Sequence, residues 1–118
     1  MTDLSPEDAK IVTLARGARL RAHAPHTGVA EGAAVRDTVG RTYAAATVEN
    51  ADPSLTTSAL RAAVAAAASS GVRTFEAAAV VSEQPVSDAD LAVLREFGAD
   101  VPVLLAGPDG VVRETLTT

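Results

Sequence analysis

The sequence predicts an α/β protein, a three-layer α/β/α sandwich in which helices cover both faces of a mixed five-stranded sheet. Two nearly continuous apolar runs, residues 75–81 and 101–106, have the length and composition of strands that are buried on both faces. Helical patterns alternate with these runs, and two shorter β-like segments precede them. The expected order of elements is therefore αββαβαββ.

The first predicted element is a helix that runs to about residue 22. Ser5 can cap its first turn, Pro6 fits the first helical position, and Asp8 stands where a capping box places an acid. Pro25 excludes further helix. The apolar residues follow the spacing of one buried helix face: Ile11, Leu14, Ala15, Ala18 and Ala22.

Three further strands are predicted around polar turns. Residues 29–36 and 41–48 are separated by residues 37–40, a turn that ends in glycine, the residue that adopts positive φ most readily. Residues 108–110 form a second turn, which leads into a final strand over residues 111–116.

Two more helices complete the pattern. One is expected over residues 56–70, capped by Thr56 or Thr57 and ended by Gly71. The other starts at residues 87–90, Ser-Asp-Ala-Asp. Its inward residues are Leu91, Leu94 and Phe97, and Gly98 ends it.

Composition limits the function classes. The 118 residues are the length of one domain, predicted to span residues 1–118, and the chain has no linker or repeat. With no cysteine, thiolate metal sites, disulfides and cysteine nucleophiles are excluded. The net charge of −5 and the 3% aromatic content disfavour nucleic-acid binding. No apolar run spans a membrane and the first residues are acidic, so we expect no membrane partner and a soluble, cytoplasmic protein.

Residues 47–61 carry the most specific signal in the chain. Thr-Val-Glu-Asn-Ala at residues 47–51 is followed after six residues by Ser-Ala-Leu-Arg at residues 58–61. This resembles the motif Asn-Val-Glu-Asn-Ala, six residues, then Cys-Ala-Glu-Arg of the small zinc-dependent cytidine deaminases. Other segments are similar to that family in the same order: residues 21–29, 32–35, 40–43, 85–87 and 93–97. The resemblance covers roughly residues 10–116 and implies the same αββαβαββ fold.

The resemblance also implies where the catalytic groups should lie. In that family a zinc ion, held by three cysteines or by two cysteines and a histidine, activates a water, and a glutamate moves the protons. The first ligand position is Ser58 and the glutamate position is Leu60, while the other two ligand positions align with Ser87 and Asp90. Since serine hydroxyls are poor zinc ligands and leucine cannot titrate, we expect no catalytic residue, no metal, no cofactor and no deaminase activity.

The nucleoside-binding positions are only partly retained. In the family an Asn and a Glu hold the ribose hydroxyls and a Phe packs on the base; the matching residues are Thr47, Glu49 and Val29. Together with Ser58 they are the candidate remnant of a ligand pocket. The favoured alternative is structural, with Asn50 capping the loop before Pro53. Arg61, which the resemblance places against the zinc thiolates, is expected to pair with Asp90 or with an interface carboxylate instead.

His23 and His26 form the other candidate cluster. Joined by Glu31 or Asp52, they could bind a hard or borderline metal ion. The favoured interpretation is that both are half-buried loop residues in place of two family tyrosines.

The predicted helix over residues 56–70 is apolar on nearly every side because it is rich in alanine. A helix of this kind is buried all round, so its outer side is predicted to be a homo-oligomer interface, of a dimer or tetramer. This agrees with the resemblance, which implies tetramers. We therefore expect a non-catalytic binding or scaffold protein with an unidentified partner. The alternatives are a nucleoside-binding or nucleotide-binding module and a hydrolase with rearranged chemistry using His23, His26, Glu49 or Asp90.

Overall fold

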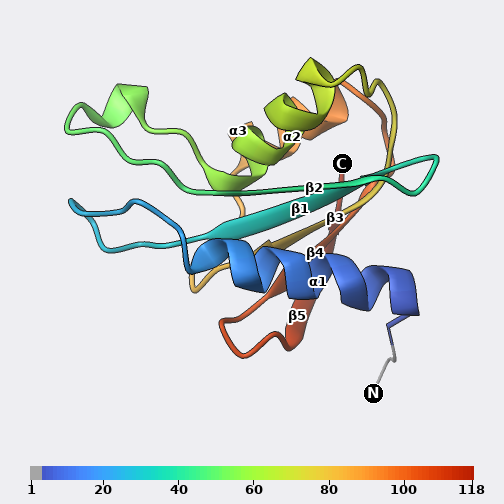
Figure 1. The fold of residues 1–118 in the computed structure, drawn as a ribbon, viewed down its shortest axis with the longest axis horizontal. Coiled ribbons are helices and arrows are strands. Elements are labelled where there is room, and N and C mark those ends of the chain that lie inside the picture. Colours follow the sequence, from blue (N-terminus) through green and yellow to red (C-terminus); the bar gives the residue numbers. More distant parts are fainter. Residues whose placement is uncertain (1–3) are drawn as a thin grey trace.

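The computed structural model describes residues 4–118 and confirms the predicted α/β architecture, a mixed five-stranded sheet with helices on both faces (Figure 1). The sheet order is β2-β1-β3-β4-β5. Only β3 and β4 run parallel, and every other neighbouring pair is antiparallel. The strands are β1 (Gly32–Asp37), β2 (Thr42–Ala46), β3 (Phe75–Val81), β4 (Pro102–Ala106) and β5 (Val112–Thr117).

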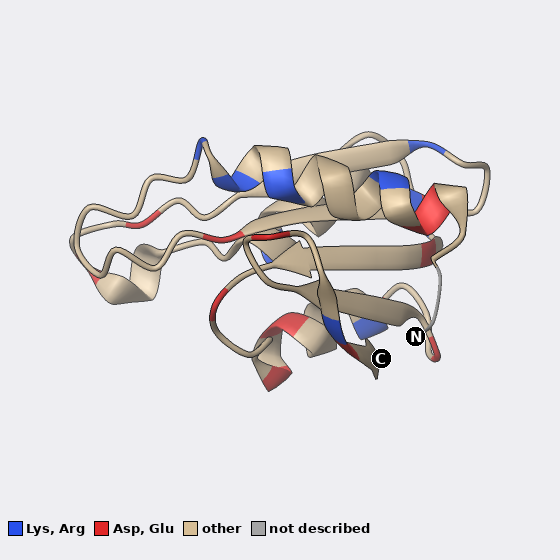
Figure 2. Ribbon diagram, turned by 90° about the horizontal axis from the view of Figure 1, so that it is seen from below, with Lys and Arg blue, Asp and Glu red and all other residues tan. Residues whose placement is uncertain are grey.

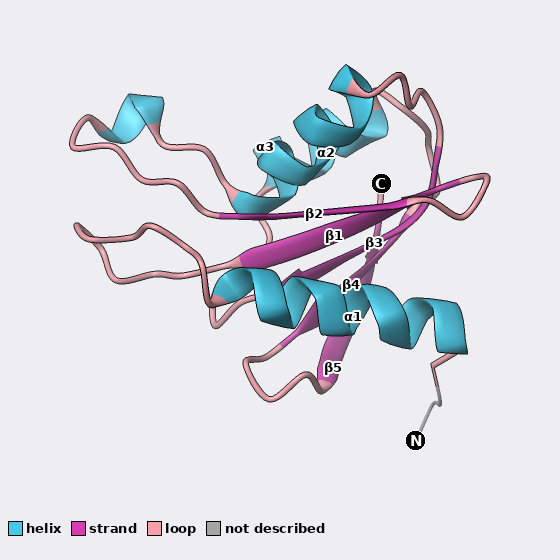
Figure 3. Ribbon diagram, in the orientation of Figure 1, coloured by secondary structure: helices cyan, strands magenta, loops and turns pink. Residues whose placement is uncertain are grey.

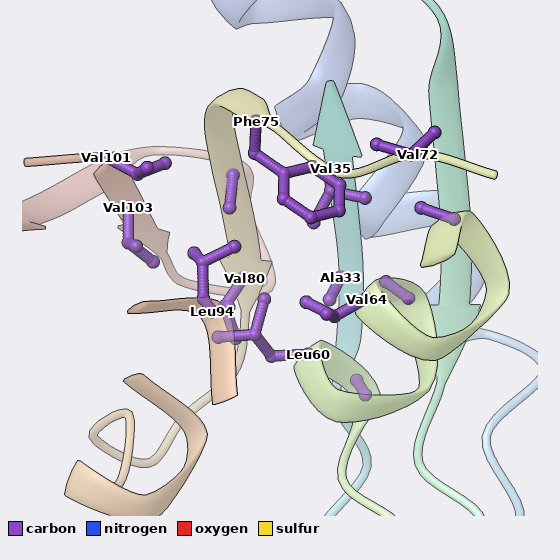
Figure 4. Packing of buried hydrophobic residues seen from close by; sticks show 14 of the residues in the cluster. Ala33, Val35, Leu60, Val64, Val72, Phe75, Val80, Leu94, Val101 and Val103 are labelled. Carbon is purple, nitrogen blue, oxygen red and sulfur yellow. The ribbon is translucent and has the colours of Figure 1, made fainter. Parts of the chain in front are cut away.

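The sheet separates the hydrophobic core into two layers, each covered by helices. The helix α1 (Pro6–Arg19) covers one face of the sheet through Ile11, Val12 and Ala15. On the other face, α2 (Ala59–Ser69) and α3 (Asp88–Arg95) pack over the larger cluster. Figure 4 shows Leu60 of α2 and Leu94 of α3 pointing toward each other above the sheet.

Strand β1 connects these two layers. All six of its residues are buried, including Arg36 and Asp37 at its end. The guanidinium of Arg36 pairs with Asp8 of α1 and with Glu76 of β3, both at 3.0 Å. Asp8 therefore sits at the third position of α1 as predicted, but its carboxylate holds the helix to the sheet.

The helix caps are partly as expected. Ser5 caps α1 by accepting from the N–H of Asp8 at 3.1 Å, as predicted, and α3 begins after Ser87, whose side chain caps it. Helix α1 ends at Arg19, earlier than residue 22, and turns occupy the next residues. Helix α2 was expected to begin at Thr56 or Thr57, which is wrong: its cap is Ser58, because Thr57 pairs with Val48 in an isolated β-bridge.

Two long connections project past the same end of the sheet, as the loops in Figure 3 show. One lies between α1 and β1, and the other between β2 and α2 with a short 3₁₀ turn at Pro53–Leu55. A bridge between His23 and Val48 joins them. Both predicted strands beside these loops are shorter than expected, since β1 begins at Gly32 and β2 ends at Ala46. None of the helices within residues 4–118 has the length and apolarity that crossing a membrane requires.

Candidate functional site

The two serines at the predicted ligand positions lie at the starts of two neighbouring helices. The Ser58 hydroxyl accepts from the N–H of Arg61 at 3.3 Å, and the Ser87 hydroxyl accepts from the N–H of Asp90 at 3.1 Å. Each therefore satisfies one backbone donor that the first turn of a helix leaves without a partner. Both serines therefore act as helix N-caps, a position at which serine is among the favoured residues.

Asp90 joins the two helix starts. Its carboxylate accepts from the Ser58 hydroxyl at 2.9 Å, so α3 is linked to the first residue before α2. Ser58, Ser87 and Asp90 are therefore brought together by the fold, as the alignment of motifs predicted. Their contacts consist of two caps and one hydroxyl–carboxylate hydrogen bond.

Leu60 lies in the core in the first turn of α2. Its side chain is 1% exposed and belongs to the cluster that α2, α3 and the sheet enclose (Figure 4). Full burial of a leucine stabilises a protein by roughly 1.5–3 kcal/mol. The position that the resemblance assigns to a proton-transferring acid is thus filled by hydrocarbon.

The loop after α1 holds the Glu49 carboxylate. Oε1 accepts from the N–H of His26 at 2.8 Å and of Thr27 at 3.2 Å, and Oε2 accepts from the Thr27 hydroxyl. The Thr27 hydroxyl, followed by the two N–H groups, holds the pKa of Glu49 below its ordinary value. The ionised carboxylate is therefore used to fix the loop.

The other candidate pocket residues differ in exposure. Thr47 is buried, and its hydroxyl accepts from the N–H of Glu31 at 3.1 Å. Val29 is 37% exposed on the projecting loop. The predicted turn at Asn50 is present, since its Oδ1 accepts from the N–H of Asp52 at 3.0 Å.

Glu31 and Ser82 form a contact that no pattern in the sequence predicts. The Ser82 hydroxyl donates to Glu31 Oε2 at 2.8 Å, and Ser82 is 2% exposed. The antiparallel register that pairs Gly32 with Val81 makes these residues neighbours. Burial raises the pKa of Glu31, the hydrogen bond from Ser82 opposes this rise, and the nearby carboxylate of Asp90 adds to it. A sequence signal was lacking because the pairing of β1 with β3 does not follow from the order of elements.

We expect Glu31→Gln to stabilise the protein at neutral pH. A raised folded-state pKa means that the native state holds its proton more tightly than the unfolded chain. The protonated Glu31 carboxyl therefore makes its full contribution to the stability of the fold below the pKa that it has in the unfolded chain. This contribution is lost as the pH rises through its pKa in the folded state. Glutamine keeps an oxygen for Ser82 and has no charge to desolvate. Urea unfolding from pH 4 upward should show a smaller decline in stability for the variant.

The matched control is Glu114→Gln, which removes one negative charge from the exposed surface of β5. It corrects for the general effect of lowering the net charge. Parallel stability–pH curves for the Glu31 variant and the wild type would contradict the prediction.

The expected half-burial of the two histidines and the expected pairing of Arg61 with Asp90 are wrong, and the alternative metal cluster is not found among the described residues. His23 and His26 are exposed rather than half-buried, and they contact the site through backbone atoms. Their proposed metal cluster with Glu31 or Asp52 is absent, because within residues 4–118 no three His, Asp or Glu side chains are placed to hold a metal ion. Arg61 is exposed and does not pair with Asp90, since Arg36 makes both ion pairs in the described part of the chain.

The donors at this site do not fit zinc as the resemblance implies it. Zinc sites in proteins use thiolate, imidazole and carboxylate ligands, usually with at least three from the protein. The side chains gathered here are the two serine hydroxyls and the carboxylates of Asp90 and Glu31. The Ser58 hydroxyl bonds to the carboxylate of Asp90 and not to a histidine, the residue that activates the serine of hydrolases.

Comparisons with known proteins agree with the fold. The family model for cytidine deaminase-like proteins matches residues 4–110. A cytidine deaminase from Sporosarcina psychrophila is 36% identical over an alignment of 111 residues, and the match covers 90% of this chain and 82% of that protein. The structure of cytidine deaminase from Burkholderia pseudomallei has a TM-score of 0.86 at 30% identity and covers 97% of this chain and 93% of that one. For the Mycobacterium tuberculosis enzyme the TM-score is 0.77 at 28% identity, over 91% and 88%.

Proposed function

This chain belongs to the cytidine deaminase-like family, and from that premise we propose that it is a non-catalytic member with a binding or scaffolding role in a homo-oligomer. The observation that supports this proposal is the hydrogen bond between Ser58 and Asp90 beside the buried Leu60. At these positions the chain has helix caps and core packing in place of metal ligands and a titratable group.

Chemical requirements support the absence of deaminase activity. A metal lowers the pKa of its bound water from about 15.7 to about 7, so loss of the metal removes roughly eight orders of magnitude in hydroxide at neutral pH. The proton transfers of deamination also need an acid and base at the reaction centre. Leu60 offers neither.

The contacts of Glu49 weigh against a nucleoside pocket as the principal function. Its two oxygens already accept from three donors on the loop at residues 26–27. A sugar hydroxyl would have to compete with these bonds. The Val29 position also has no ring on which a base could stack.

Helix α2 is the proposed oligomer interface. Five of its residues face the core of the chain, while Arg61, Ala65 and Ala66 are exposed on its outer side. The small side chains permit close approach of a helix from a second copy. The outer side of α2 is therefore exposed in a single chain, as an interface with a second copy requires.

The test uses the purified wild-type protein. We expect no stoichiometric zinc by elemental analysis, no conversion of cytidine by ultraviolet absorbance, and a dimer or tetramer by light scattering. A thermal-shift screen against nucleosides should be flat, because a ligand at 100 times its Kd would add about 2.7 kcal/mol of stability. Bound zinc with turnover would overturn the non-catalytic role, a nucleoside shift would favour the pocket, and a monomer would remove the interface.

A further inference from the structure

Helix α1 after its first turn, together with most of the loop that follows it, carries basic residues and no acidic ones. Residues 9–30 contain four of the ten Lys and Arg residues and none of the fifteen Asp and Glu residues, in a protein of net charge −5. In Figure 2 the blue segments follow the long helix α1 along its length, and red appears only in its first turn. Lys10, Arg16, Arg19 and Arg21 therefore form a local excess of positive charge in an acidic protein.

A hollow of about 430 Å³ lies within this basic region, and the turn before β5 forms its far side. Apolar surface comes from Leu20, which is 83% exposed, and from Pro108. Arg16 and Arg19 contribute the charge. The lining residues are Thr13, Arg16, Gly17, Arg19, Leu20 and Pro108.

The two guanidinium groups are held in place by the backbone. The Nε of Arg16 donates to the carbonyl of Pro108 at 2.9 Å, and the Nε of Arg19 donates to the carbonyl of Ala30 at 3.0 Å. Within residues 4–118 neither side chain makes another hydrogen bond or an ion pair. Each therefore retains the donors of its two terminal nitrogens, and fixing Nε in advance lowers the cost of ordering these long side chains around a ligand.

The negative end of the α1 helix dipole offsets only part of this positive charge. A helix C-terminus carries the equivalent of about half a negative charge, which favours cations in the last turn. Arg16 and Arg19 bring two full charges to that turn, and Arg21 follows directly. The local balance therefore stays positive.

We propose that this hollow binds a phosphomonoester. Two guanidinium groups three residues apart on one helix face offer paired N–H donors to a tetrahedral dianion, and the surfaces of Leu20 and Pro108 accept the organic substituent. The site is on the α1 side of the sheet, across from Ser58 and Asp90 on the α2 and α3 side. It is therefore separate from the proposed scaffold function.

The experiment titrates the full-length protein with phenyl phosphate and follows binding by calorimetry and by amide chemical shifts. We expect saturable binding, with the largest shifts at residues 13–20 and 108. Arg16→Gln and Arg19→Gln should each weaken it by about tenfold or more, since a charge-assisted hydrogen bond contributes about 1.5–3 kcal/mol.

Arg95→Gln is the matched control. The Nε of Arg95 also donates to a main-chain oxygen on the surface, that of Thr118 at 2.8 Å, so this variant loses the same side-chain charge away from the hollow. An equal loss of binding in this control would show general charge attraction and overturn the proposal. Unchanged binding in the Arg16 variant would do the same. If Arg19→Gln unfolds, the Arg16 variant decides alone.

Three further ligands identify the chemistry. Inorganic phosphate should bind more weakly than phenyl phosphate, and phenol should not saturate. Binding of phenol equal to that of phenyl phosphate would overturn the role of the two arginines. Vesicles of anionic lipid distinguish a membrane surface from a soluble ligand, because binding to vesicles without binding to phenyl phosphate would refute the soluble phosphomonoester.

Discussion

Replacing Gly32 with alanine should destabilise the protein by about 3 kcal/mol or more, the upper end of the cost of overpacking a core. A Cβ at this position would lie 2.0 Å from the carbonyl oxygen of Ala15 and 2.5 Å from the amide nitrogen of Arg19. These atoms are four residues apart in α1, as are the partners of an α-helical hydrogen bond. The methyl group would have to break the turn or move α1 away from β1. Thermal unfolding should show a melting temperature lower by on the order of 10 °C or more.

The control is Gly17→Ala on the same helix. A Cβ at Gly17 meets nothing within 4 Å, and alanine favours the helix by roughly 1 kcal/mol over glycine. The two substitutions are chemically identical, yet one should raise the melting temperature and the other should lower it. A Gly32 variant as stable as the wild type would show that α1 does not pack on β1 at backbone distance.

Much of the fold could be predicted from local patterns. The apolar runs that became β3 and β4, the serine cap of α1 and the start of α3 depend on neighbouring residues alone, so the sequence reveals them directly. The start of α2 could not be predicted, because Thr57 is held extended by its bridge to Val48, a contact between separate segments. The close approach of α1 to Gly32 is likewise a tertiary feature.

The candidate site was predictable to a similar degree. The spacing of residues 47–61 and the later segments correctly placed Ser58 near Asp90. Glu31 and Ser82 were missed because they meet only through the register of β1 and β3. The partners of Glu49 were missed as well, since the loop that supplies the N–H groups of His26 and Thr27 has no pattern that predicts its path.

Leu60→Glu is the substitution that would restore the acid of the family motif, and we expect it to unfold the protein or to cost more than about 4 kcal/mol at neutral pH. Leu60 is 1% exposed, and its surroundings are the hydrocarbon side chains of the core cluster. A carboxylate buried in this hydrophobic cluster would lose its hydration. Typical domains are stable by only about 5–15 kcal/mol in total.

The pH dependence identifies the cause of the loss. Burial raises the pKa of the introduced carboxyl, so the variant should be least unstable at acidic pH, where this group is neutral, and should weaken as the pH rises. Leu60→Gln has the same shape without the charge and should show no such slope. Leu60→Met conserves volume and should cost less than about 1.5 kcal/mol. Denaturant unfolding of the three variants from pH 4 to 8 measures these differences.

The Leu60→Glu variant also tests whether restoring this acid alone gives deaminase activity. Even where it folds, the positions aligned with the family's metal ligands still carry the hydroxyl of Ser58 and the carboxylate of Asp90, a donor set that does not suit zinc. We therefore expect no conversion of cytidine at any pH at which the protein is folded. A stable variant with measurable turnover would contradict both the burial argument and the non-catalytic proposal, because it would show that a single side chain separates this core from an active site.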